Sequence, residues 1–283
     1  MKILLTGKNG QIGWELCRAL APLGEIAAYD RAELDLAAPD RIVAAVRSTM
    51  PDVVVNAAAY TAVDQAEREP AAAHAINAAA VAVLADEARH TGALLVHFST
   101  DYVFDGSKET PYVEEDVPNP LNEYGRSKLA GEQAIRETGG RHLILRTSWV
   151  YSARGRNFFL TMKRLLQEKQ EVRVIVDQVG APTCAAAIAD ATAAILGKSD
   201  RRPNGVYHLT ASGSTSWHGF ATAIARLERS ATRVVPILSE AYPSPARRPR
   251  NSRLSNEKLL RQFGFALPSW EDGLKAVVEA SPR

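Results

Sequence analysis

A short apolar segment followed by a glycine-rich turn opens this chain and limits what it can fold into. Ile3-Leu-Leu5 has the composition of a buried strand, and glycines follow at positions 7, 10 and 13, around a helix that begins near Gln11. Gly7 allows the turn, Gly10 lets a phosphate approach the backbone, and Gly13 lets the helix pack closely. The free N–H groups at the helix start favour a pyrophosphate. Because the spacing is Gly-x-x-Gly-x-x-Gly rather than the commoner Gly-x-Gly-x-x-Gly, the loop alone is a weak indication.

Strand-like and helix-like segments alternate through the first half of the chain. Buried strands are predicted over residues 52–56, 94–98 and 142–146, and Ala-rich helices over 70–90 and 123–138. This alternation predicts an α/β fold with a doubly wound parallel sheet of the Rossmann type. Ligands of such sheets bind beyond the carboxyl ends of the strands.

The second half of the chain is less regular. Residues 172–176 and 206–209 have the composition of strands, and a proline-rich loop spans 236–249. We therefore expect a dinucleotide-binding domain over residues 1–150, to which segments around 172–198 return. Residues 151–283 should form mainly a smaller, substrate-binding lobe.

Composition excludes several classes of function. The 283 residues are 46% hydrophobic and 23% charged, with a formal net charge of +2, which argues against a nucleic-acid or membrane partner. Cys17 and Cys184 give no disulfide framework, and the six histidines lack zinc-site spacing, so no metal site is predicted. No apolar run approaches the ~20 residues of a membrane span, and no signal peptide is evident. We expect a cytoplasmic protein.

The second predicted strand, residues 25–30, ends in an acid. Asp30 is placed to accept hydrogen bonds from the adenosine ribose hydroxyls, which favours NADH. Arg31 follows directly and would instead accommodate the 2′-phosphate of NADPH. Asp30 is equally suited to capping the turn after the strand. The sequence therefore predicts NADPH or NADH without choosing between them.

A tyrosine and a lysine lie four residues apart in the predicted helix over 123–138. Tyr124 and Lys128 project from one helix face, one turn apart. A nearby ammonium favours the phenolate, so Lys128 should lower the pKa of Tyr124 from its usual ~10 and make it an acid/base catalyst. The same spacing also arises by chance on solvated helix faces.

Polar and aromatic side chains follow three of the predicted strands. The stretches 56–61, 99–104 and 146–151 each come at the carboxyl end of a strand. Since these ends share one edge of a parallel sheet, their side chains should meet Tyr124 and Lys128 around one point. The pattern predicts a single active site there.

These features together resemble the extended short-chain dehydrogenase/reductase superfamily and, within it, the dTDP-4-dehydrorhamnose reductase family. The similarity extends over nearly the whole chain. It is carried by six runs, residues 7–16, 56–64, 99–104, 146–151, 177–183 and 242–254.

The resemblance implies a role for each matching residue. Tyr124 would donate the proton, Lys128 would tune its pKa and hold the nicotinamide ribose, and Thr100 would hydrogen-bond the substrate near its carbonyl. The residues implied for cofactor binding, besides Tyr124 and Lys128, are Gly7, Gly10, Gln11, Ile12, Gly13, Asp30, Asp35, Leu36, Ala59, Tyr60 and Thr61. Those implied for substrate binding are Thr100, Asp101, Trp149 and Arg248.

Some of these assignments have simpler alternatives. Trp149 could be a core aromatic and Asp101 a turn cap. The arginines at 247, 248, 250 and 253 form a charge run that is usually solvated, although a nucleotide-sugar diphosphate needs cationic partners such as these.

The reaction implied is reduction of the C4 ketone of dTDP-4-dehydro-L-rhamnose by NAD(P)H. Two other readings stay open: another reductase or epimerase of nucleotide sugars, and a non-catalytic subunit like the regulatory subunit of methionine adenosyltransferase. A dehydratase would need a further acid where Tyr102 follows Asp101. The intact set of Thr100, Tyr124 and Lys128 favours an enzyme.

The resemblance also raises the question of assembly. Some family members dimerise through magnesium held by acidic side chains, one of which is matched here by Glu15. After Thr183, where another acid is expected, the chain reads Cys184-Ala-Ala-Ala187. Because magnesium prefers carboxylate oxygens, we expect a monomer or a dimer built without metal.

Overall fold

A six-stranded parallel sheet forms the centre of the protein. The computed structural model describes residues 1–198 and 204–281. The sheet has the order β10-β5-β4-β3-β1-β2, and each neighbouring pair is parallel. Its strands are β1 (Lys2–Thr6), β2 (Glu25–Tyr29), β3 (Val53–Asn56), β4 (Leu94–Thr100), β5 (His142–Thr147) and β10 (Gly205–His208). The predicted α/β fold with a Rossmann-type sheet is confirmed.

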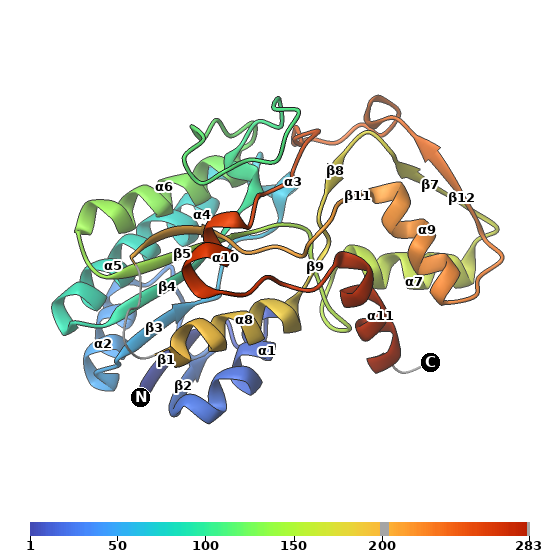
Figure 1. Cartoon of the computed structure of the whole chain (residues 1–283). Coiled ribbons are helices and arrows are strands. Elements are labelled where there is room, and N and C mark those ends of the chain that lie inside the picture. Colours follow the sequence, from blue (N-terminus) through green and yellow to red (C-terminus); the bar gives the residue numbers. More distant parts are fainter. Residues whose placement is uncertain (199–203, 282–283) are drawn as a thin grey trace.

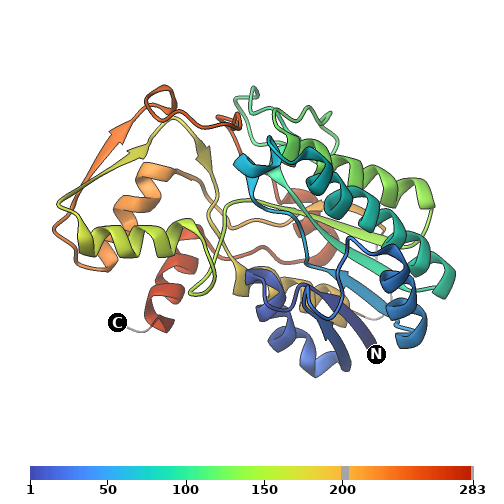
Figure 2. The ribbon, with the colours of Figure 1, turned by 180° about the vertical axis from the view of Figure 1, so that it is seen from behind.

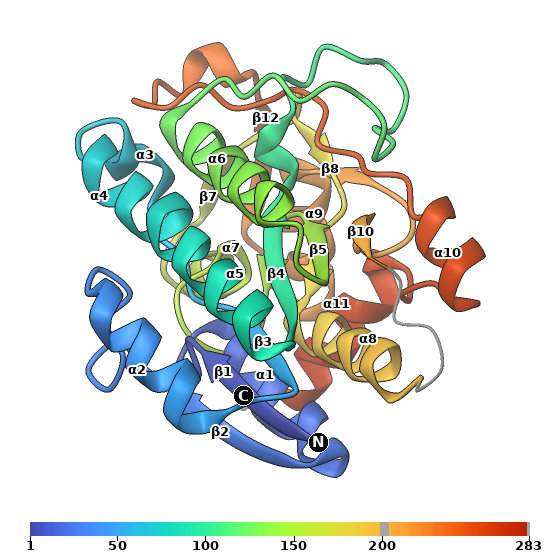
Figure 3. The same cartoon turned by 90° about the vertical axis from the view of Figure 1, so that its left-hand side faces the viewer.

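Helices cover both faces of this sheet (Figures 1 and 3). One face carries α1 (Gln11–Leu20), α8 (Ala185–Gly197) and α10 (Glu257–Phe263). The other carries α2 (Pro39–Thr49), α5 (Ala80–Thr91) and α6 (Glu123–Thr138). Ile3 and Leu5 of β1 pack toward the first face and Leu4 toward the second. Burial on both faces explains why the strands are unbroken apolar runs in the sequence.

The helix predicted over residues 70–90 is composite. It consists of α4 (Pro70–His74), a π-helical turn (Ala75–Ala79) and α5, and short α3 (Val63–Ala66) precedes it. Asn77 in the π turn is buried, and its amide binds both the N–H and the C=O of Tyr60. The π turn thus fixes the segment that follows β3.

A smaller part of the molecule lies beyond the carboxyl ends of the main strands (Figures 1 and 2). It contains α7 (Phe158–Glu168), α9 (Trp217–Leu227), α11 (Trp270–Ala280) and the parallel pair β7 (Glu171–Ile175) and β12 (Arg233–Ile237). Two further short pairs are β6 (Val150–Tyr151) with β9 (Thr183–Cys184), and β8 (Val179–Gly180) with β11 (Thr215–Ser216). Its core gathers around Phe159, Phe220 and Trp270.

The chain crosses between the two parts more than once. Within residues 172–198, β7 lies in the smaller part, whereas α8 packs against α1 of the larger part. Residues 206–209, expected in the smaller lobe, instead contribute β10 to the edge of the main sheet. We propose that α8, β10 and α10 belong with residues 1–150, and that the rest of 151–281 forms the substrate-binding lobe. No helix within the described ranges is long and apolar enough to cross a membrane.

The strand order places a crevice at the carboxyl edge of the sheet. β1 lies between β2 and β3. The connection after β1 runs through α1 on one face of the sheet, whereas the connection after β3 runs through α5 on the other face. Such a switch point leaves room for a ligand between the two connections. The smaller part closes this edge from the far side.

Candidate active site

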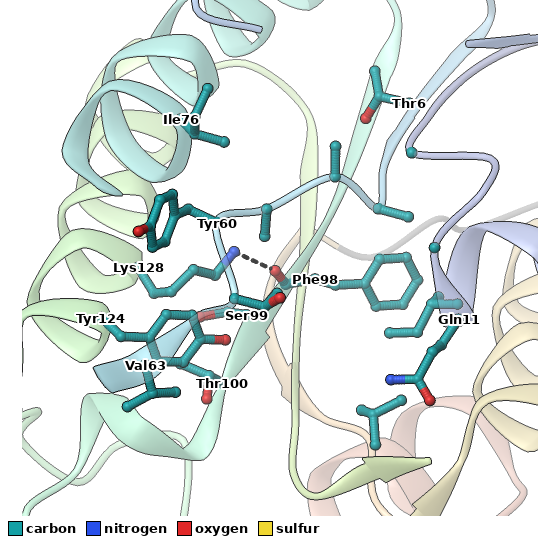
Figure 4. A pocket seen from close by; sticks show the side chains of 18 of the residues that line it. Thr6, Gln11, Tyr60, Val63, Ile76, Phe98, Ser99, Thr100, Tyr124 and Lys128 are labelled. Carbon is teal, nitrogen blue, oxygen red and sulfur yellow. Dashed lines mark hydrogen bonds between the residues drawn. The ribbon is translucent and has the colours of Figure 1, made fainter. Parts of the chain in front are cut away.

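A cavity of about 990 Å³ occupies the crevice, and Figure 4 shows part of its lining. The predicted site residues that line it are Gly7, Gly10, Gln11, Ile12, Asp30, Asp35, Leu36, Ala59, Tyr60, Thr61, Thr100, Asp101, Tyr124, Lys128 and Trp149. Gly13 and Arg248 lie outside this lining. The structure therefore brings most of the candidate residues to one place.

The glycine loop has the shape that a dinucleotide requires. Gly7 has a φ of +78°, and a Cβ there would lie 2.8 Å from the backbone nitrogen of Ala58. A Cβ on Gly13 would lie only 2.0 Å from the Gly7 carbonyl oxygen, so glycine is needed for α1 to approach the loop. Gly10 caps α1 without a side-chain hydrogen bond, which leaves the helix N–H groups to a ligand. These residues fit a pyrophosphate.

Asp30 caps a turn and also lines the cavity, so its contact with the adenosine ribose stays a prediction. Its Oδ1 accepts the N–H groups of Ala32 at 2.9 Å and Glu33 at 3.1 Å, and its Oδ2 accepts Asn9 Nδ2 at 3.0 Å. The hydrogen bond from the Glu33 N–H, with smaller contributions from its other partners, lowers the pKa of Asp30. Asp30 thus caps the turn after β2 while it lines the cavity, and Arg31 lines it too.

The start of α6 positions the tyrosine and the lysine. Asn122 caps the helix by accepting the Gly125 N–H at 2.8 Å. A Cβ on Gly125 would lie 2.2 Å from the Tyr102 carbonyl oxygen, so this glycine lets α6 approach the end of β4. Tyr124 and Lys128 consequently reach the cavity from successive turns (Figure 4).

The predicted direction of the Tyr124 pKa is wrong. Removal of the phenol from water raises the pKa to about 12, because this effect outweighs a hydrogen bond with Thr100. The Lys128 ammonium points elsewhere: Nζ lies 2.7 Å from the Phe98 carbonyl oxygen and 3.1 Å from His97 Nε2. Burial also lowers the pKa of Lys128 to about 8. The spacing in the sequence correctly predicts that Tyr124 and Lys128 share a helix face. It does not indicate that burial affects the pKa of Tyr124 more than the charge of Lys128 does.

His97 is a buried residue that the sequence reading missed. It is fully buried in β4, between Lys128 Nζ and Asn56 Nδ2, which lies 3.1 Å from Nδ1. Asn56 Oδ1 in turn accepts Thr6 Oγ1 at 2.6 Å. Burial, helped by the Lys128 charge, lowers the pKa of His97 well below its usual value and keeps the ring neutral. The sequence feature that could have identified His97 is a histidine within an otherwise apolar predicted strand, residues 94–98.

Two tryptophans form one wall of the cavity. Trp149 stacks on Trp217 with ring centroids 3.5 Å apart and planes 6° apart. Its backbone φ is +49°, a strained value for a residue that is not glycine. A Cβ on Gly180 would lie 2.6 Å from the Trp149 ring, so Gly180 makes room for the indole. Trp217 was not predicted, because it begins α9, far along the chain from the other motifs.

Arg248 makes structural contacts with Asp64 and Ser244. Its Nη2 lies 2.7 Å from Asp64 Oδ2, and its Nη1 lies 2.7 Å from Ser244 Oγ. These contacts hold the loop before β-bridge residue Asn251 against α3. Arg248 is therefore occupied and stays outside the cavity lining, so substrate binding by this residue remains a prediction.

The other three arginines of the run differ in their contacts. Arg250 pairs with Glu240, and Arg253 binds the Asn251 side chain. Arg247 is exposed and, within the residues that the structure describes, its guanidinium has no recorded partner. Arg247, like Arg248, lies outside the cavity lining.

A further loop reaches the glycine turn from the smaller part. Gln11 Oε1 accepts Asn157 Nδ2 at 2.7 Å and Ser152 Oγ at 3.2 Å. Arg156 in this loop is exposed and lines the cavity. No motif spacing pointed to it, because a single basic residue in a loop is usually a solvated one.

Known proteins match this chain along its whole length. A family model described as RmlD substrate binding domain matches residues 1–282. The dTDP-4-dehydrorhamnose reductase of Burkholderia thailandensis is 53% identical over 95% of each chain. That of Escherichia coli K12 is 47% identical over 98% of this chain and 97% of the relative. The chain belongs to the dTDP-4-dehydrorhamnose reductase family.

Solved structures agree with this family assignment. The family member from Bacillus anthracis, solved in complex with NADP, is 37% identical, covers 99% of this chain and all of its own, and has a TM-score of 0.94. The Yersinia enterocolitica member is 30% identical over 98% of both chains, with a TM-score of 0.90. The family predicted from the six sequence runs is confirmed.

Proposed function

We propose that this protein is an NADPH- or NADH-dependent reductase that converts the C4 ketone of dTDP-4-dehydro-L-rhamnose to the alcohol of dTDP-L-rhamnose. One observation carries the proposal: a glycine loop that fits a dinucleotide and the set of Thr100, Tyr124 and Lys128 line one cavity. Full-length relatives that bear the name of this activity, and a family member solved with NADP, support it.

Each of three cavity residues, Tyr124, Lys128 and Thr100, has a distinct role in the proposed carbonyl reduction. A nicotinamide cofactor, when bound, supplies the hydride. Tyr124 donates its phenolic proton to the carbonyl oxygen as negative charge develops there, and its raised pKa keeps it protonated at neutral pH. Lys128 places a positive charge in the same cavity, which stabilises that developing charge. Thr100 hydrogen-bonds Tyr124 and orients the phenol.

Cofactor and substrate would occupy different ends of the cavity. Gly7, Gly10 and the start of α1 would hold the pyrophosphate, and Asp30 would hold the adenosine ribose. The Trp149–Trp217 wall lines the same cavity and would offer an apolar face to a deoxysugar. The arginines at 247, 248, 250 and 253 are the candidates for the substrate diphosphate; among them Arg247 has an exposed guanidinium, although, like Arg248, it lies outside the cavity lining.

A turnover assay tests the proposal. The purified protein is mixed with NADPH and a panel of nucleotide keto-sugars that includes dTDP-4-dehydro-L-rhamnose, and cofactor oxidation is followed by absorbance. We expect turnover with that substrate and weaker turnover with UDP- or GDP-linked analogues. Preference for a different keto-sugar would assign another reductase of the superfamily, and no oxidation with any of them would favour a non-catalytic subunit.

Replacement of Asp30 should change cofactor preference. The wild-type protein is expected to use NADH and NADPH with no very large difference. Asp30→Ala removes repulsion of a 2′-phosphate, so the ratio of kcat/KM for NADPH over NADH should rise by about 10-fold. Asp40→Ala, which removes an exposed acid on α2 outside the cavity, is the matched control. An unchanged ratio in Asp30→Ala would place Asp30 away from the ribose.

Assembly should not depend on a metal ion. Glu15 lies 3.1 Å from Arg18, which also reaches Asp190 of α8 at 2.7 Å, so these acids already have a cationic partner. We expect a monomer or a metal-independent dimer whose light-scattering mass is the same with and without EDTA. A dimer that dissociates on chelation would contradict this expectation. A cytoplasmic location, in keeping with free Cys17 and Cys184, stays part of the proposal.

A further inference from the structure

Asp101 is a buried acid beside the reacting groups to which the mechanism above gives no task. It follows β4, is 3% exposed and lines the cavity. Its Oδ1 lies 3.1 Å from Thr100 Oγ1, within hydrogen-bond distance. Its Oδ2 is buried and has no hydrogen-bond partner of ordinary geometry among the described residues. Burial raises the pKa of this carboxyl and has a larger effect than the nearby Ser252 hydroxyl, which lowers it. A buried carboxylate that lacks enough hydrogen-bond donors or a counter-charge is costly in free energy. The protonated form of Asp101 is therefore favoured.

Thr100 connects this acid to the proton donor. Its hydroxyl oxygen accepts the Tyr102 N–H at 3.1 Å and lies 3.1 Å from Asp101 Oδ1. When Asp101 is protonated, the carboxyl donates to this oxygen, and the single hydroxyl hydrogen of Thr100 points to Tyr124, with which Thr100 shares a hydrogen bond. A hydroxyl can pass on one proton while it receives another, because it has one donor hydrogen and two acceptor lone pairs. Tyr124, Thr100 and Asp101 therefore form a continuous hydrogen-bonded chain that ends in a carboxyl.

The two ends of this chain differ in acidity. Burial raises the pKa of Tyr124 to about 12 and that of Asp101 to about 7. If Tyr124 alone gave up its proton, a phenolate would remain in a site that disfavours it, next to Asp101. Negative charge is better tolerated on the carboxyl, which loses its proton more readily than the phenol.

We propose that Asp101 stores the proton that replaces the one Tyr124 donates, and that it does so through Thr100. As the Tyr124 proton passes to the alkoxide oxygen, the Thr100 hydroxyl proton passes to the phenol oxygen and the Asp101 proton passes to Thr100. The alcohol product gains one proton, Tyr124 and Thr100 end unchanged, and Asp101 ends as a carboxylate. Water recharges Asp101 after product leaves. This inference rests on the proposed reductase function.

The effect of Asp101 on the pH dependence must be distinguished from the effects of the other ionisable groups around it. Tyr102 and Tyr124 face the carboxyl, but burial raises the pKa of both far above neutrality. Arg248 lies beyond Tyr102 and stays charged. Lys128 lines the same cavity, and its pKa is lowered to about 8, so its loss of charge also reduces the rate on the alkaline side.

Single-turnover kinetics as a function of pH test the proposal. The reduction rate should be highest below about pH 7, where Asp101 holds its proton. Above that it should fall with a limiting slope of about −2, one proton from Asp101 and one from Lys128. Asp101→Asn keeps a hydrogen-bonding group beside Thr100 but has no proton to transfer. Its rate at about pH 6 should fall about 10- to 100-fold, and its slope should drop to about −1.

Thr100→Val supplies the second variant. This substitution interrupts the hydrogen-bonded chain between Tyr124 and Asp101, so the inflection near pH 7 should disappear from its pH profile. Adding Asp101→Asn to Thr100→Val should not lower the reduction rate further. Additive losses, or an Asp101→Asn profile with the wild-type slope, would overturn the proposal. If Asp101→Asn does not fold, the pH profile of Thr100→Val alone decides: a retained inflection contradicts the relay.

Infrared spectroscopy of the ligand-free protein tests the storage site without turnover. A protonated-carboxyl band should disappear as pH rises through about 7 in the wild type and be absent in Asp101→Asn. A carboxyl that is already ionised at about pH 5 would overturn the proposal even if the reductase assay succeeds. A failed reductase assay with the band present would reject the function while leaving the proton store supported.

Discussion

Tyr124→Phe should lower turnover by about two to four orders of magnitude, the usual contribution of a general acid. The substitution keeps the ring and its edge-to-face contact with Tyr102, at 5.7 Å between centroids, so the cavity keeps its shape. Only the donor hydroxyl and its hydrogen bond with Thr100 are lost. The dissociation constant of NADPH, measured by fluorescence titration, should change little, because the hydroxyl acts in the chemical step.

The matched control is Tyr151→Phe, which removes a hydroxyl from a fully buried tyrosine. Tyr151 lies outside the cavity lining, and its hydroxyl has no hydrogen-bond partner among the described residues. Its loss should leave kcat unchanged. Near-wild-type turnover in Tyr124→Phe would remove Tyr124 from the mechanism.

Glu132→Gln should destabilise the protein by about 3–5 kcal/mol, the usual result of leaving one partner of a buried ion pair alone. Glu132 and Arg146 are fully buried and meet through two hydrogen bonds, at 2.6 and 2.9 Å. Arg146 Nη1 already has no partner, so glutamine would leave a buried guanidinium without its counter-charge. Urea unfolding followed by circular dichroism measures the free energy.

Glu168→Gln provides the comparison for this loss. Glu168 pairs with Arg164 at 3.0 Å on the exposed face of α7, so solvent and salt screen the interaction. Its replacement should change the unfolding free energy by less than about 1 kcal/mol. If the two substitutions changed the free energy of unfolding equally, burial of the Glu132–Arg146 pair would not increase its contribution to stability.

The fold was predictable because local sequence and global structure agree. Gly7 and Gly13 occupy positions where a Cβ would collide with backbone, so their spacing carries geometric information. The apolar runs are strands buried on both faces, and α6 spans the predicted 123–138. Sequence order alone also indicated that strand ends meet at one edge, since parallel strands present their carboxyl ends together.

The electrostatics and the long-range partners were not predictable in the same way. The pKa of Tyr124 depends on how much water the cavity admits, which helical spacing does not specify. Arg248 had the charge of a diphosphate ligand, but its partner Asp64 is distant in sequence. His97 and Trp217 acquire their places only when β4, α6, β6 and α9 come together.

The position of β10 at the edge of the sheet affects how the chain can be made. β5 ends at Thr147 and its neighbour β10 begins at Gly205, so a ribosome adds roughly 60 residues before the partner exists. At ~5–20 residues per second, the β5 edge stays open for several seconds, with unpaired backbone groups available to other chains. During biosynthesis, this edge can therefore pair with other chains until β10 has been made.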